Sequence, residues 1–203
     1  MLRPNSAHRI ISGLLLMLTL GCTTHVSITS RGHALVDTKP IQGAVHPYQW
    51  SHPPRPDPGP FVVAYFSTID NLEKRAETWT HHLFFKLIPC SQKAHDYDDL
   101  YSGDVFLATG DERSRILGDS AALDQTLYKV HIPVTLETMI RQMNVIGDLD
   151  VAKYVKTAEN DGVCIKLGGG QMWGAELTSN LIQSPVAIHD NVLTVVTDSQ
   201  QGS

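Results

Sequence analysis

The sequence predicts a mainly β fold, sandwich-like in form, that carries one or two short helices. Apolar and polar residues alternate from Tyr128 to Glu137, a period of two that is typical of a strand with one buried face. Short apolar runs at 61–66 and 104–108 are typical of buried strands, and turn-forming residues separate the later runs. An α+β two-layer fold, with a helix over 149–159, is the alternative.

Two segments carry the strand pattern most clearly. One face of the first is apolar throughout, at Tyr128, Val130, Ile132, Val134 and Leu136. Pro133 lacks a backbone donor, so this strand is predicted to lie at an edge or to contain a bulge. The run from Trp79 to Cys90 is apolar on most of both faces, which predicts a central strand covered on two sides.

The C-terminal third also favours strands. Residues 151–170 place Asn160-Asp161-Gly162 between two β-rich runs, which predicts a hairpin. Residues 192–196 predict a last strand, after a turn at His189-Asp190. Short helices are expected near 70–78 and from 136 to 143.

The first 21 residues have the pattern of a secretory signal peptide. Arg3 and Arg9 make its start basic, and no acidic residue precedes Cys22. The apolar run over 10–20 is shorter than the roughly 20 residues that a membrane-spanning helix needs. A basic start, a short apolar centre and a small residue before a cut point predict removal of residues 1–21.

The segment Leu18-Thr19-Leu20-Gly21-Cys22 resembles the lipobox of bacterial lipoproteins, in which a small residue precedes an obligatory cysteine. The resemblance implies that Cys22 is acylated and becomes the mature N-terminus. Several acyl chains on one residue give durable membrane anchoring. Thr23 rather than Asp follows the cysteine, which by the same resemblance favours the outer membrane, facing the periplasm.

A proline-rich segment follows, since seven of the 11 prolines lie between Pro40 and Pro60. Such a run favours extended polyproline II structure. We therefore divide the chain into a signal peptide (1–21), a lipidated N-terminus with a proline-rich tether (22–60) and a single β-rich domain (61–203). A proline-rich loop packed on the domain is the alternative to a tether.

Charge excludes one class of partner. Without Arg3 and Arg9, 14 of the 16 basic residues remain against 21 acidic ones, a formal charge of −7. Nucleic-acid binders need a basic face, so no nucleic-acid partner is predicted. The two cysteines of the mature domain, Cys90 and Cys164, are predicted to form a disulfide, because an exported protein lies in an oxidising compartment.

No catalytic or metal site stands out. Gly118-Asp119-Ser120 resembles the nucleophile block of the GDSL hydrolases, which implies Ser120 as nucleophile. The chain has no Asp-x-x-His tetrad to supply the base, and a serine without a base is a weak nucleophile. The acidic residues of 95–104 and the ten histidines match no metal-binding spacing, so neither a metal nor a cofactor is predicted.

The most unusual stretch is 168–180, where three glycines precede Gln171, Met172 and Trp173. One interpretation is a glycine bulge and hairpin with Trp173 buried in the core. The other is an adaptable loop that presents Gln171, Met172 and Trp173 to a partner, since tryptophan is frequent at binding hot spots.

These observations together predict an envelope lipoprotein that binds another envelope protein and catalyses no reaction. An accessory or assembly factor of an outer-membrane or secretion machine fits this description. The alternatives are an immunity-type lipoprotein that neutralises a toxin in the periplasm, and a periplasmic hydrolase that uses Ser120.

Overall fold

The computed structural model describes residues 23–37, 43–45, 59–79, 82–91, 100–118, 124–135, 151–170, 176–190 and 192–196. In chain order the elements are β1 (Thr23–Val26), β2 (Thr29–Val36), β3 (Phe61–Thr68), α2 (Leu72–Trp79), β4 (Leu83–Pro89), β5 (Tyr101–Leu107), α3 (Gly110–Leu117), β6 (Thr126–Pro133), α5 (Val151–Asp161), β7 (Val163–Gly170), β8 (Glu176–Ser179), β9 (Ile182–Gln183), β10 (Val186–His189) and β11 (Val192–Val195).

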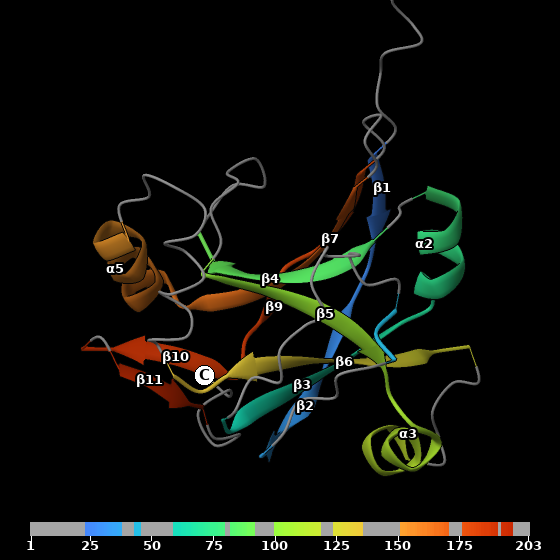
Figure 1. Ribbon diagram of the computed structural model, residues 1–203, viewed down its shortest axis with the longest axis horizontal. Coiled ribbons are helices and arrows are strands. Elements are labelled where there is room, and N and C mark those ends of the chain that lie inside the picture. The colour runs from blue at the N-terminus through green and yellow to red at the C-terminus, as the bar shows by residue number, and fades with distance from the viewer. Residues whose placement is uncertain are drawn as a thin grey trace, which may run out of the picture.

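The strands form one curled sheet in the order β1-β8-β7-β4-β5-β6-β3-β2, with β9 beside β7 and a separate β10–β11 hairpin (Figure 1). Strand β5 joins the two halves of this sheet. Its first residues, 101–104, pair with β4, and its last, 105–107, pair with β6. A strand that leaves one half-sheet and enters the other makes a corner of a sandwich.

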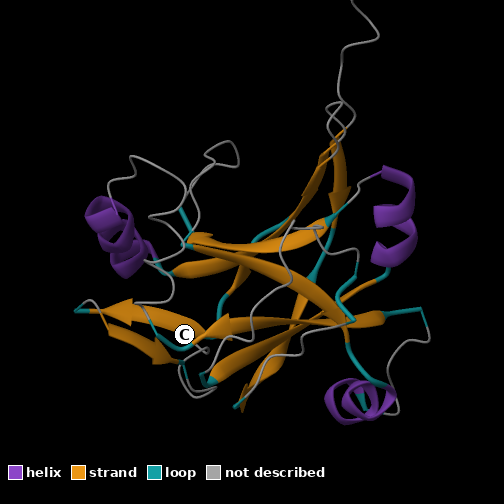
Figure 2. Cartoon of the chain, in the orientation of Figure 1, coloured by secondary structure: helices purple, strands orange, loops and turns teal. Residues whose placement is uncertain are grey.

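The opposite corner is made by β1 and β2, which only Ser27 and Ile28 separate. Strand β1 runs parallel to β8, and β2 runs antiparallel to β3. Strands β1 and β2 therefore stand at the two ends of the strand order although they are consecutive in the chain. The sheet thus curls almost back onto itself. The mainly β fold class with a few short helices is confirmed (Figure 2).

The core lies between the two half-sheets because each strand turns one set of alternate side chains inward. From β3 and β6 these are Val62, Ala64, Phe66, Tyr128, Val130 and Ile132; from β4 and β7 they are Leu83, Phe85, Leu87, Val163, Ile165 and Leu167. Every residue of β3 is buried. On its outer face Val63 and Tyr65 belong to a cluster that includes Ile116 and Leu117 of α3 and also Ala34 and Val36 of β2. Helix α2, expected near 70–78, begins where the Asn71 side chain accepts a hydrogen bond from the Lys74 amide at 2.9 Å.

The position predicted for the strand that ends at Pro133 is wrong. β6 is central, between β5 and β3, and not at an edge or bulged. Pro133 is tolerated because it is the last residue of β6, beyond the end of the ladder with β5 at Val130. The strand predicted before Cys90 is central, since β4 lies between β7 and β5. It is not covered on both sides, because Phe84 and Lys86 on its outer face are half-exposed, and Trp79 belongs to the end of α2 and not to this strand.

The hairpin predicted over 151–170 is also wrong, because its first half is the helix α5. Val155 and Ala158 lie three residues apart and are both buried against the core, which is helical spacing. Gly162 has φ of 79° and directly follows the helix, where a left-handed residue is common. A turn-like Asn-Asp-Gly here ends a helix and does not join two strands. The helix proposed from 136 to 143 lies outside the described residues.

The tether also needs correction. Residues 23–36 belong to the sheet, so the folded domain begins at β1 and not at residue 61. Val36 and Phe61 are direct partners in the β2–β3 ladder, so the chain between them returns to its starting point. A segment with paired ends cannot space a domain away from an anchor that precedes both strands.

Candidate functional site

Four side chains form a polar cluster beneath α3: Tyr65, Thr109, Glu112 and Lys129. It is the most elaborate such group in the part of the chain that the structure describes. Its helix begins with a capping box, in which the Thr109 side chain accepts from the Glu112 amide and the Glu112 side chain accepts from the Thr109 amide. This helix is not among the elements predicted from the sequence. The signal was present, since Thr109 and Glu112 have the required spacing of three.

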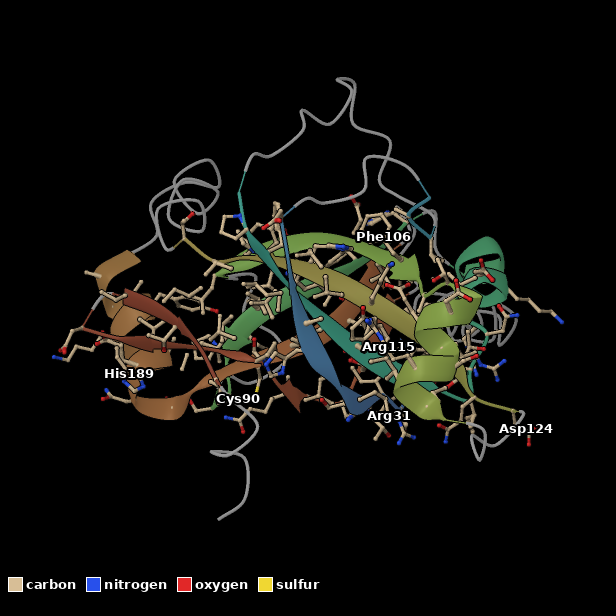
Figure 3. The ribbon with its side chains drawn as sticks, turned by 90° about the horizontal axis from the view of Figure 1, so that it is seen from below. Arg31, Cys90, Phe106, Arg115, Asp124 and His189 are labelled. Carbon is tan, nitrogen blue, oxygen red and sulfur yellow. A yellow bond between two sulfur atoms is a disulfide. The ribbon has the colours of Figure 1, made fainter. Side chains whose placement is uncertain are left out.

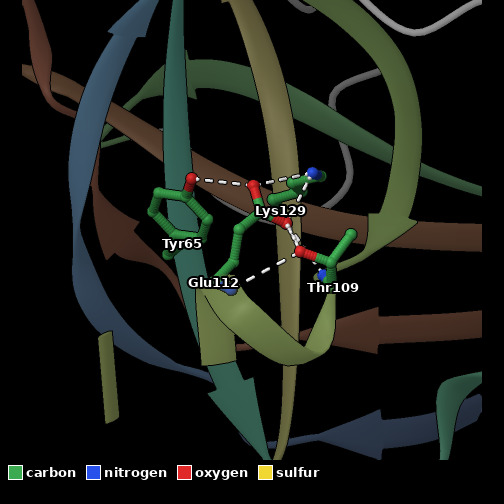
Figure 4. A network of polar contacts seen from close by, with 4 residues as sticks. All are labelled: Tyr65, Thr109, Glu112 and Lys129. Carbon is green, nitrogen blue, oxygen red and sulfur yellow. Dashed lines mark hydrogen bonds and ion pairs between the residues drawn. The ribbon is translucent and has the colours of Figure 1, made fainter. Parts of the chain in front are cut away.

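Glu112 holds the cluster together (Figure 4). Lys129 Nζ, from β6, donates to both carboxylate oxygens at 2.8 and 2.7 Å. Tyr65 Oη, from β3, donates at 3.1 Å, and the Thr109 amide donates at 2.8 Å. The helix is therefore fastened by one carboxylate to two neighbouring strands.

These contacts fix the charge state of the carboxyl group. Burial acts to raise the pKa of Glu112, but the hydrogen bonds and charge of Lys129, together with the Thr109 amide and Tyr65, lower it to about 2. Burial, and then the Glu112 charge, raise the pKa of Tyr65, while Arg115 opposes them. Glu112 is thus ionised and Tyr65 protonated near neutral pH, so neither is poised for proton transfer. The arrangement positions α3.

Three arginines surround this cluster. Arg31 Nε donates to Ser67 Oγ at 2.7 Å, and its Nη2 donates to Gln125 Oε1 at 2.6 Å. Arg113 Nη2 donates to the Gln125 carbonyl at 3.1 Å. Arg115 is exposed on α3 and interacts with the Tyr65 hydroxyl, whose pKa it acts to lower. Arg31 and Gly32 lie opposite the same tyrosine in the β2–β3 ladder, and Asp124 lies apart from both arginines (Figure 3). We call Arg31, Arg113 and Arg115 the arginine cluster.

A bulge in β2 places Arg31 in this cluster. The register of the β2–β3 ladder shifts between Ser30 and His33, so that Arg31 and Gly32 together oppose Tyr65. Gly32 has φ of 97°, a conformation that suits glycine at a bulge. The extra residue allows Arg31 to reach the outer face of β3, where it contacts Ser67.

The second unusual surface is the edge formed by β2. In the described part this strand pairs only with β3. Leu35 is directly opposite Val62, a core residue with no exposed surface, yet Leu35 itself is 62% exposed. A leucine on the core-facing side of the sheet is therefore left uncovered where the curled sheet ends.

The cysteine prediction agrees with the structure, which places Cys90 and Cys164 at disulfide distance with their sulfur atoms 2.07 Å apart. The pair joins the end of β4 to β7. Other predicted site residues lie outside the described residues: Cys22, Ser120, Gln171, Met172 and Trp173. Gly118 ends α3, so a helix precedes this serine.

The glycines before Trp173 do not form a bulge. Gly168 and Gly169 pair in regular register with both β4 and β8. Gly168 makes room for Phe84, because a Cβ atom there would lie 2.7 Å from the phenylalanine ring. The glycine run therefore has a packing role within β7, whatever the loop after it does.

The histidines that the structure describes do not gather. His131 is buried between the rings of Phe61 and Phe106, with centroids at 6.4 and 5.1 Å. His189 ends β10 at the hairpin turn, as predicted (Figure 3). Within the described residues no group of three metal-ligating side chains occurs, and no helix is long and apolar enough to cross a membrane.

Compared with protein-family models and with characterised proteins, the chain matches none.

Proposed function

We propose that this chain is an envelope lipoprotein whose β domain binds another envelope protein and catalyses no reaction. The signal peptide and the lipobox at Cys22 support export and anchoring. Cys90 and Cys164 at disulfide distance fit the oxidising compartment that export implies.

The exposed edge of β2 is the observation that carries protein binding. An edge strand presents unpaired backbone groups, and proteins that avoid pairing protect such edges with charges, bulges or cover. The bulge of β2 lies at Arg31 and Gly32, and after it the strand runs regularly to Val36. Leu35 is exposed in this regular part. A partner strand added here gains backbone hydrogen bonds and covers Leu35.

The position of the anchor supports the same proposal. Strand β1 begins at Thr23, the residue after Cys22, so acylation of Cys22 seats this end of the sheet at the membrane. The last residues of β2 and helix α3 lie at the opposite end of the molecule from the start of β1 (Figure 1). The proposed binding edge therefore faces away from the membrane, where another envelope protein can reach it.

Site-specific photocrosslinking tests this function. We place a photoreactive phenylalanine analogue at Leu35, and at Val192 as the matched control, since both are exposed apolar strand residues at 62% and 59%. We expect a discrete adduct in envelope fractions from position 35 only. Replacing Val36 by Asp in the position-35 protein should abolish it. Equal adducts from both positions, or none from position 35, would contradict the proposal.

A further inference from the structure

We propose, resting on the proposed function, that the partner presents an extended acidic segment whose carboxylates bind the arginine cluster beside the edge of β2. The cluster combines Arg31 of β2 with Arg113 and Arg115 of α3.

The hydrogen bonds of the cluster orient the guanidinium groups without neutralising them. Arg31 donates to a hydroxyl and to a side-chain amide oxygen, and Arg113 donates to a backbone carbonyl. All three acceptors are neutral. A guanidinium has five donor hydrogens in a planar fork, so these contacts leave donors for a carboxylate.

The nearby carboxylates do not neutralise the cluster. Glu112 forms its ion pair with Lys129 at 2.7 Å. Asp111 and Asp124 are exposed, and in the described part of the chain neither forms an ion pair with Arg31, Arg113 or Arg115. The whole chain has a formal charge of −5, so this basic group is a local exception. Carboxylates suit it by charge and by geometry.

The free edge of β2 in the described part indicates that the ligand of this surface is a polypeptide. Arg31 and Leu35 belong to the same strand, about 13 Å apart at the rise of an extended chain. A segment that pairs with this edge can therefore place a carboxylate near the arginines and an apolar side chain over Leu35. Strand addition supplies affinity through the backbone, and side chains at alternate positions supply specificity.

An anionic membrane fits these observations less well. The arginine cluster lies with α3 at the end of the molecule remote from the start of β1 (Figure 1). Anchoring at Cys22 therefore turns the arginines away from the bilayer that holds the chain. Lipid headgroups also cannot use the backbone edge of β2.

The test measures binding of a fluorescent peptide of alternating glutamate and valine to the full chain in mild detergent. A glutamine-for-glutamate peptide and phosphatidylglycerol vesicles are the comparison probes. Arg115→Gln is the main variant because this side chain is exposed, and Arg31→Gln is the second, used only if its thermal unfolding matches the parent. Lys156→Gln, an exposed charge change on α5, is the matched control.

We expect Arg115→Gln to weaken binding of the acidic peptide about tenfold, the value of one charge-assisted hydrogen bond. Added salt should weaken parental binding, whereas Lys156→Gln and the parent should bind alike. Equal binding of the glutamine peptide, no effect of Arg115→Gln, or binding to vesicles alone would overturn the inference.

The two proposals fail in different ways. In one case the adduct from position 35 forms to the same extent in the parent and in Arg115→Gln, and peptide binding is insensitive to this change. That result overturns the arginine site and leaves the proposed function standing. Arginine-dependent peptide binding with no adduct from position 35 supports the arginine site and counts against the proposed function.

Discussion

The side chain of Asn180 hydrogen-bonds to both backbone groups of Ile28. Its Oδ1 accepts from the Ile28 amide at 2.7 Å, and its Nδ2 donates to the Ile28 carbonyl at 3.0 Å. Ile28 lies in the two-residue link between β1 and β2. Before this link the chain pairs with β8, and after it the chain pairs with β3. The amide side chain thus replaces a strand neighbour at the point where the sheet changes partner, and Ile28 remains buried.

Asn180→Ala should destabilise the fold by about 2 kcal/mol, because it leaves a donor and an acceptor of a buried residue without partners. Asn180→Asp keeps the acceptor and loses the donor, so we expect an intermediate loss. Denaturant unfolding followed by circular dichroism measures both. Equal stability of the parent and Asn180→Ala would show that this contact does not close the sheet.

The two glycines that lie opposite phenylalanines should differ in their tolerance of alanine. A Cβ atom at Gly103 would lie 2.8 Å from the buried ring of Phe85, and one at Gly168 would lie 2.7 Å from the half-exposed ring of Phe84. The exposed ring can move aside more easily. We expect Gly103→Ala to cost about 2 to 3 kcal/mol and Gly168→Ala about 1 kcal/mol.

A double mutant separates this clash from a general preference for glycine. In the Phe84→Ala background, Gly168→Ala should lose much less folding stability, because the new methyl group clashes with the Phe84 ring. Additive losses in the two single variants and the double variant would contradict the packing role of Gly168.

Local patterns in the sequence account for much of this fold. The alternation at Tyr128, Val130 and Ile132 predicts β6, and the turn at His189-Asp190 precedes the last strand. Gly162 misled the interpretation, because positive φ serves a helix end as well as a hairpin turn. Only the burial of Val155 and Ala158 distinguishes the two.

The remaining elements depend on contacts between distant parts of the chain. β2 is mostly polar and half-exposed, so its own residues give little strand signal. Asn180 and Ile28 are 152 positions apart, and no local pattern links them. The arginine cluster likewise brings Arg31 together with a helix some 80 residues later in the chain. Its formation could therefore not be predicted from local sequence patterns.

Acid should weaken the fold through Glu112. Its pKa is about 2 in the folded chain against an ordinary value of 4.5, so the folded state favours the ionised form. This stabilisation is complete above about pH 4.5 and is lost as the pH falls toward 2. Glu112→Gln should lose about 2 kcal/mol at pH 7 and show less loss of stability between pH 5 and 3 than the parent.

Denaturant midpoints across this pH range measure the effect. Asp124→Asn is the control, because Asp124 is exposed near the start of β6. A parallel pH dependence in the parent and in Glu112→Gln would mean that other carboxyl groups govern the acid response.

Replacing both Cys90 and Cys164 by Ala should lower the free energy of unfolding by about 4 kcal/mol. The bond closes a loop with a sequence separation of 74, and the entropy of that loop in the unfolded chain gives this value. Peptide mapping without reduction should recover the crosslinked pair from the native protein. Two thiols that alkylate freely in unreduced, denatured protein would show that the bond does not form.

Cys22→Ser should separate anchoring from folding. The lipobox predicts acylation at Cys22, whereas the sheet begins at Thr23 and the disulfide partners are Cys90 and Cys164. The variant should therefore move from the membrane fraction to the soluble fraction and keep the thermal unfolding midpoint of the parent, because none of its described strand pairings involves residue 22. Intact-mass analysis of the membrane-extracted parent should find acyl chains on an N-terminal Cys22. A mature chain that begins elsewhere, or a Cys22→Ser protein that stays with membranes, would contradict the anchor. Without it, no part of the sheet is held at the membrane, and the edge of β2 and the arginine cluster lose their fixed orientation away from it.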